Sequence, residues 1–94
     1  MSDMFKESIE NAQRYVNLMK QASKDEINGK PTDVTIEQAN KALEKHIWLL
    51  DQIEKRGFKE AFEKGGYQNK LNKMFGTMDE DIKRSTEILQ ATYT

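Results

Sequence analysis

The sequence holds one histidine, His46, which is the first candidate for catalysis because imidazole changes charge near neutral pH. It lies between Leu43 and Leu50, toward the apolar side of a helical pattern. A general base needs a partner that orients it and a substrate within hydrogen-bond reach. The sequence offers no such set, so we expect a partly buried histidine that bonds to a carbonyl or a carboxylate.

Other residues with catalytic or metal-binding chemistry lack the required spacing. Carboxylate metal sites in helical bundles use Glu-x-x-His, but Leu43 stands three residues before His46. The acids at 79–81 point in different directions on a helix, and they suit its positive N-terminal end better than a calcium loop. The chain has no cysteine, and Gly65-Gly66 is not followed by the Lys-Ser/Thr of a phosphate loop. We therefore predict no enzyme activity, no metal and no cofactor.

Trp48 breaks the amphipathic pattern of its helix. The predicted apolar stripe consists of Ile36, Ala39, Leu43, Ile47, Leu50 and Ile53. At roughly 100° per residue, Trp48 falls about 160° from Leu50, on a charged face. Tryptophan is enriched among the residues that dominate protein interfaces, so Trp48 is the candidate anchor for a protein partner or for a second copy of the chain. The predicted partner-binding surface comprises Trp48, Lys41, Lys45, Gln52 and Lys55.

Burial within the monomer is the competing interpretation of Trp48, because tryptophan is largely buried on average. The segment 67–75 carries more aromatic side chains than one helical stripe needs, and it is the expected cover. The sequence leaves both interpretations open.

A second candidate surface lies between Lys64 and Lys73, a stretch that contains no acid. Basic side chains beside an aromatic ring can hold phosphates and stack on a base, which predicts a nucleotide or nucleic-acid site at Lys64, Tyr67, Lys70 and Lys73. Such a protein is expected to form an oligomer with the site between subunits. The whole chain has 15 basic and 16 acidic residues, so we rank this function below protein binding.

Length and composition favour one helical domain over residues 1–94. Apolar residues make up 36% of the chain and recur at helical spacing, which argues against disorder. No signal segment or membrane-spanning run is present in the sequence, and we expect a cytoplasmic protein.

The elements that must position these residues are all predicted to be helical. Apolar residues spaced three and four apart predict main helices over 3–22, 35–56 and 78–92, with a loop over 23–34 and short helical pieces over 58–64 and 67–75. The predicted fold class is all-α, a small bundle of three main amphipathic helices plus one or two short helices.

Local signals mark the ends of these helices. Thr35–Gln38 and Thr77–Glu80 have the residue types of capping boxes, in which a threonine hydroxyl accepts a backbone N–H. Gly57 is placed to end the second main helix in a left-handed conformation, with Phe58 folding back onto Ile53.

Two classes of protein share features with the chain. Secreted WXG-type hairpin proteins have this size and a central tryptophan, but Leu49-Leu50 follows Trp48 where their Trp-x-Gly turn belongs. In length and in its lysine and asparagine content, the chain resembles small phage and mobile-element proteins that block host factors. That resemblance is compositional, and it implies an inhibitor or regulator that binds a protein.

Overall fold

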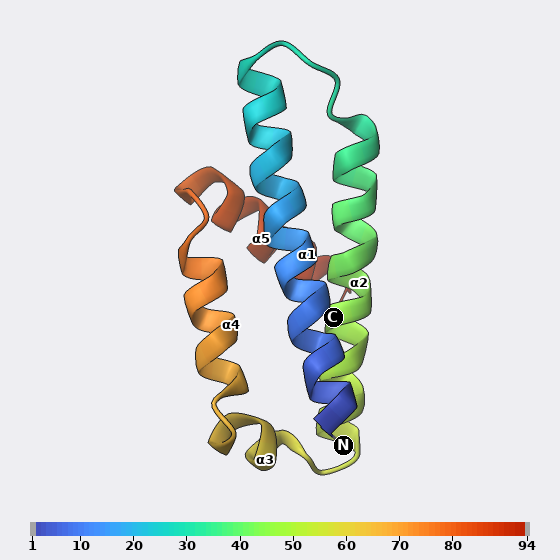
Figure 1. Cartoon of the computed structure of the whole chain (residues 1–94). Helices are drawn as coiled ribbons and strands as arrows, with labels where there is room; N and C mark the ends of the chain where they lie inside the picture. The colour runs from blue at the N-terminus through green and yellow to red at the C-terminus, as the bar shows by residue number, and fades with distance from the viewer. Residues whose placement is uncertain (1, 94) are drawn as a thin grey trace.

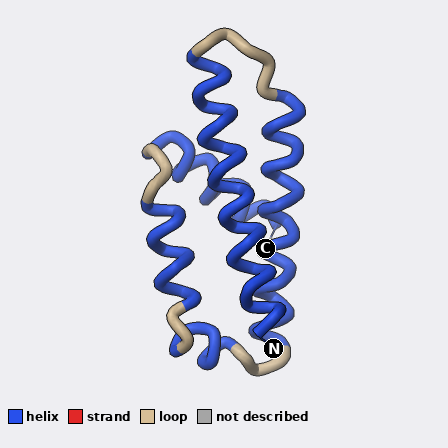
Figure 2. Tube along the Cα trace, viewed as in Figure 1, coloured by secondary structure: helices blue, strands red, loops and turns tan. Residues whose placement is uncertain are grey.

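The structure is a computed structural model that describes residues 2–93, except for the side chains at positions 2, 81, 85, 89, 90, 92 and 93. Its elements are α1 (Ser2–Ile27), α2 (Asp33–Lys55), α3 (Lys59–Lys64), α4 (Tyr67–Gly76) and α5 (Glu80–Tyr93). Figure 2 shows helices joined by loops, and no strand occurs within the described range. The predicted all-α bundle is confirmed. None of the described helices is long and apolar enough to span a membrane.

The two long helices form an antiparallel hairpin to which the shorter helices attach (Figure 1). Helix α3 turns the chain at the open end of this hairpin. Helix α4 then runs along α1 and shares an apolar cluster with both long helices. Helix α5 passes behind α1 and reaches α2. One side of α2 therefore faces away from the rest of the bundle.

The buried face of α1 follows the predicted helical spacing of three and four residues. Its buried members are Phe5, Ser8, Ala12, Tyr15, Val16 and Ala22. A stripe of this kind buries its apolar area against neighbouring helices, at roughly 25 cal/mol for each Å² removed from water.

Two apolar clusters divide the core along the hairpin. The first joins α1, α2 and the start of α5, and it includes Val16, Leu43 and Ile82. The second joins α1 and α2 to α3 and α4, and it includes Phe5 and Leu71. The short helices thus complete the core at one end, and α5 completes it nearer the middle of the hairpin.

A buried hydrogen bond ties α5 to α1. The Thr86 hydroxyl donates to the Ile82 carbonyl oxygen at 2.7 Å, which uses its one proton. The Tyr15 hydroxyl, 2.6 Å from Thr86 Oγ1, must therefore be the donor in that contact. Burial raises the pKa of Tyr15, and the bond to Thr86 opposes this shift. The phenol thus stays neutral and keeps its proton for Thr86 at physiological pH.

The predicted end of α2 is confirmed in detail. Gly57 has φ of 79°, a conformation that residues with a Cβ rarely adopt. The Phe58 N–H donates to the Ile53 carbonyl at 2.9 Å, and the Gly57 N–H donates to the Glu54 carbonyl at 3.0 Å. This is the Schellman arrangement, and it returns Phe58 to the same apolar cluster as Ile53.

The connection between α1 and α2 is shorter than predicted. Helix α1 continues to Ile27 because the residues after Ala22 include no helix breaker before Asn28-Gly29. The loop therefore covers 28–32, where we expected 23–34, and Gly29 takes a φ of 71°.

Both predicted capping boxes were wrong. Helix α2 begins at Asp33 with Thr32 as its N-cap, so Thr35 already lies inside the first turn. Thr77 lies at the end of α4 instead, where its hydroxyl donates to the Met74 carbonyl at 2.7 Å. Asp79 caps α5, because its Oδ1 accepts the Ile82 N–H at 2.9 Å.

The remaining helix bounds differ little from the predicted ones. Helix α5 begins at Glu80, two residues after the predicted start at 78, because Asp79 is its cap. It ends at Tyr93, and α3 and α4 each differ from their predicted ranges by one residue at one end. Differences of this size are ordinary for helix ends.

The buried side of α2 is rotated relative to the predicted stripe. Its buried residues are Ala39, Ala42, Leu43, His46, Leu49 and Ile53. The expected stripe members Ile36, Ile47 and Leu50 are exposed or half-buried. Helix α5 is the physical reason, because it packs on α2 and extends the buried area beyond the surface that faces α1.

Candidate functional site

His46 lies in the core, where α1 and α2 face each other. Its ring is 1% exposed, and its Nδ1 lies 2.9 Å from both the backbone carbonyl oxygen and the hydroxyl of Ser8. A carbonyl oxygen only accepts hydrogen bonds, so Nδ1 must carry the proton. The other ring nitrogen, Nε2, is then an acceptor, and it is buried with no hydrogen-bond partner in the described part of the chain.

This environment makes His46 a neutral structural residue. Burial lowers the pKa of His46, and the hydrogen bond to the Ser8 carbonyl opposes that shift. The ring also packs near Phe75, with 6.0 Å between the two centroids. The predicted hydrogen bond from a buried histidine to a carbonyl is therefore confirmed.

Ser8 is the buried polar partner of His46, and sequence reasoning missed it. It occupies a buried position of α1, three residues after Phe5 and four before Ala12. A small polar residue inside an apolar stripe is the signal that could have identified it, because a buried hydroxyl needs a polar partner.

Trp48 projects from the outward side of α2. Its side chain is 52% exposed, and the Lys45 Nζ lies 4.6 Å from the centroid of its ring. Helix α4 packs along α1 and leaves the indole half-exposed. The interpretation that the segment 67–75 buries Trp48 is thus wrong, because α4 packs on α1 and reaches α2 at His46, which lies about 160° around the helix from Trp48.

The other residues of the predicted partner-binding surface share this side of α2. Lys41 and Lys55 are exposed and form ion pairs with Glu37 at 3.8 Å and with Asp51 at 2.9 Å. Gln52, one turn after Trp48, is half-buried. Exposed ion pairs of this kind contribute about 0–1 kcal/mol, so a partner can exchange them for its own contacts at small cost.

The second predicted surface is already engaged within the chain. The Tyr67 ring stacks on Phe62 at 5.5 Å and forms a T-shaped contact with Phe5 at 5.2 Å between centroids. The Lys70 Nζ lies 5.3 Å from the centroid of the same ring. Lys64 is paired with Glu60 at 2.6 Å. The Tyr67 ring therefore packs within the chain, and its stacking face is occupied by Phe62 instead of a nucleic-acid base.

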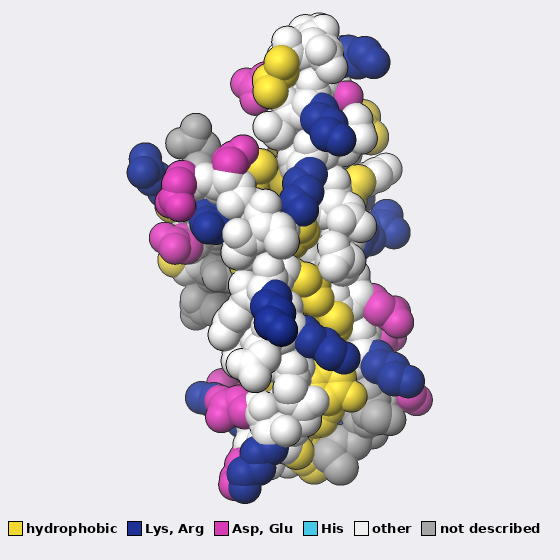
Figure 3. All heavy atoms as spheres, turned by 60° about the vertical axis from the view of Figure 1, so that its left-hand side comes forward, with side chains coloured by type: hydrophobic (Ala, Val, Ile, Leu, Met, Phe, Trp, Pro, Cys, Tyr) yellow, Lys and Arg dark blue, Asp and Glu magenta, His cyan; other side chains and the backbone are white. Residues whose placement is uncertain are grey.

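Basic side chains are nonetheless visible along the middle of the face that α1 and α4 present (Figure 3). Lys70 and Lys73 are exposed. Acidic side chains lie mostly toward the edges of this view. The arrangement attracts anions only weakly, because the protein as a whole carries a net charge of -1.

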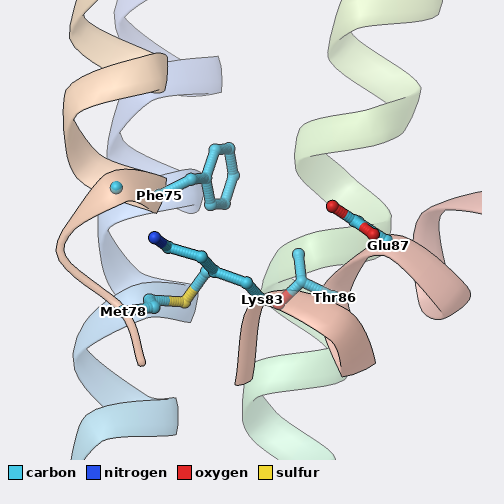
Figure 4. A pocket seen from close by; sticks show the side chains of 6 residues that line it. Phe75, Met78, Lys83, Thr86 and Glu87 are labelled. Carbon is cyan, nitrogen blue, oxygen red and sulfur yellow. The ribbon is translucent and has the colours of Figure 1, made fainter. Parts of the chain in front are cut away.

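A small cavity lies where α4 meets α5 (Figure 4). Phe75 and Met78 supply its apolar wall, and Lys83, Thr86 and Glu87 line it from α5. Its volume of about 250 Å³ is below the range that encloses a small-molecule ligand. The side chains of the described residues also form no cluster of three or more histidine, aspartate or glutamate groups that could hold a metal.

Comparisons with protein-family models, with curated proteins and with solved structures give no match to this chain.

Proposed function

We propose that this chain is a non-enzymatic interaction protein that binds a protein partner through the outward side of α2. The observation that carries the proposal is Trp48, a large aromatic side chain that is 52% exposed on a helix whose opposite side is buried. The proposal covers inhibitor, adaptor and regulator roles, which share this mode of binding.

Physical chemistry favours Trp48 as the anchor. An indole offers a large contact area with only two rotatable side-chain bonds, so it loses little conformational entropy on binding. The lysine beside it already lies against the ring, so its aliphatic stem can contribute contacts while its amine stays in water. Burial of the exposed half of the indole provides the hydrophobic core that interfaces need at their centre.

Trp48→Ala should reduce partner binding by at least about 30-fold, which is the loss expected of an interface hot spot. The measurement is affinity capture from the cells that express the protein, followed by titration of the captured partner against purified variants. Ile27→Ala is the matched control, because Ile27 is 82% exposed at the far end of the hairpin. That variant should bind like the wild type.

Equal binding by the wild type and Trp48→Ala would contradict the proposal. A second contradicting result is binding of single-stranded nucleic acid that weakens steeply with salt and is lost in Lys70→Ala/Lys73→Ala. That outcome would assign the function to the face formed by α1 and α4.

A further inference from the structure

The outward side of α2 carries a regular pattern of exposed residues that extends beyond Trp48. Positions 34, 38, 41, 45, 48, 52 and 55 alternate in steps of four and three, the spacing of a coiled-coil seam. We call this set the basic seam: Val34, Gln38, Lys41, Lys45, Trp48, Gln52 and Lys55. Each member is exposed except Gln52, which is half-buried. The seam spans about 32 Å at a rise of 1.5 Å per residue.

The seam has apolar contact points at a fixed separation. Val34, 67% exposed, and Trp48, 52% exposed, stand two heptads apart. Each is flanked by seam residues with long, flexible side chains that can lie along a partner helix. Spacing of this kind matches the periodicity of another α-helix, because residues seven apart return to the same face.

The charges along the seam indicate which residues a helix packed on it would carry. The seam holds three lysines and no acid, whereas an acidic row of Glu37, Glu44 and Asp51 follows one of its edges. The opposite edge borders Ala42 and Leu49, which are buried. Lys41 pairs with Glu37 and Lys55 with Asp51 across the acidic edge, so a partner exchanges those two ion pairs for its own. A partner that faces the seam therefore meets positive charge at its centre and negative charge along one side.

From this pattern we infer that the partner contributes an acidic amphipathic helix that packs along the basic seam, with apolar side chains placed to meet Trp48 and Val34. Carboxylates of that helix would pair with Lys41, Lys45 and Lys55. Basic residues on its flank would pair with the acidic row, as flanking charges do in coiled coils. This inference rests on the proposed function and specifies its partner.

Other occupants fit the charges less well. An antiparallel second copy centred on Trp48 would place Lys41 opposite Lys55, and a parallel copy would place each lysine opposite itself. A nucleic-acid backbone would meet the carboxylates of the acidic row beside the lysines. An acidic helix avoids both conflicts.

The test is selection from a displayed library of 21-residue helical peptides, randomised on one face, against the full-length wild-type protein. Peptides that also bind Trp48→Ala are removed. We expect the selected peptides to contain at least several-fold more aspartate and glutamate than the starting library, with apolar residues spaced three, four or seven apart. A selected peptide should bind the variant Lys41→Glu/Lys45→Glu/Lys55→Glu at least tenfold more weakly than the wild type. A peptide whose acids are exchanged for lysine should regain binding to that variant.

The control variant is Lys6→Glu/Lys20→Glu/Lys24→Glu, which makes the same charge change at exposed positions of α1. It should bind the selected peptides like the wild type. Equal losses in the two triple variants would overturn the inference, as would selected peptides without excess acid or a library that yields no binder. Concentration-dependent dimerisation that Trp48→Ala abolishes would overturn it in favour of a second copy.

The two proposals fail separately. If Trp48→Ala loses its natural partner but the selected peptides are not acidic, protein binding stands and the acidic helix is wrong. If the natural partner binds Trp48→Ala as tightly as the wild type, the proposed function itself is wrong.

Discussion

Phe5→Ala should lower the free energy of unfolding by about 3–5 kcal/mol, the usual result of truncating a buried phenylalanine. Phe5 is 5% exposed, and its ring forms T-shaped contacts with Phe62 and Tyr67 at centroid distances of 5.3 and 5.2 Å. These three rings join α1 to α3 and α4, so the truncation removes apolar burial and aromatic contacts together. Urea denaturation followed by circular dichroism measures the change.

Two comparison variants make this result specific. Phe5→Leu retains most of the buried volume and should cost less than half as much. Trp48→Ala should change stability by less than about 1 kcal/mol, because its side chain is half-exposed. Hydrogen exchange in Phe5→Ala should accelerate first in α3 and α4. A decrease in the free energy of unfolding of Phe5→Ala below about 1 kcal/mol would show that the ring cluster does not hold α3 and α4 in place.

The second large effect is a dependence of stability on pH that comes from His46. Burial lowers the pKa of this ring in the folded protein, so the unfolded chain binds a proton more readily. Stability from this group is complete above the unfolded pKa of about 6.5 and falls as pH drops below it, by up to about 1.4 kcal/mol per pH unit. The decline continues until the pH reaches the lowered pKa of the folded state.

Denaturation midpoints between pH 8 and pH 5 measure this slope, and His46→Gln provides the matched control. The variant should lose the part of the slope that begins near pH 6.5, whatever its absolute stability. His46→Leu is a second control without a titratable ring. The explanation is wrong if both variants keep the wild-type slope, because carboxylates would then account for all of it.

Local signals predicted some parts of the fold well. Gly57 was identified because a glycine after an amphipathic run suits a left-handed helix end, and this requirement is local in sequence. The predicted N-caps Thr35 and Thr77 are wrong because several polar residues near each helix start can serve as caps. The choice among them depends on where the preceding chain ends its own structure, as where the Thr77 hydroxyl bonds back to the Met74 carbonyl at the end of α4.

Tertiary contacts explain the rest of the differences. The periodicity of α2 placed Trp48 opposite the core correctly, but it could not show that Ala42 packs with Ile82 of α5 in the same apolar cluster. Pairing between Ser8 and His46 joins residues 38 positions apart, so neither local spacing nor composition predicts it. The exposed fraction of Trp48 likewise depends on where α4 packs.

Collisional quenching of the single tryptophan tests the central claim most directly, because all tryptophan fluorescence of the chain comes from Trp48. We expect long-wavelength emission that acrylamide quenches freely at every protein concentration, and protection when a binding helix is added. Blue-shifted emission that stays protected on dilution would contradict the account, because it would mean that Trp48 is buried within the chain or in a tight oligomer.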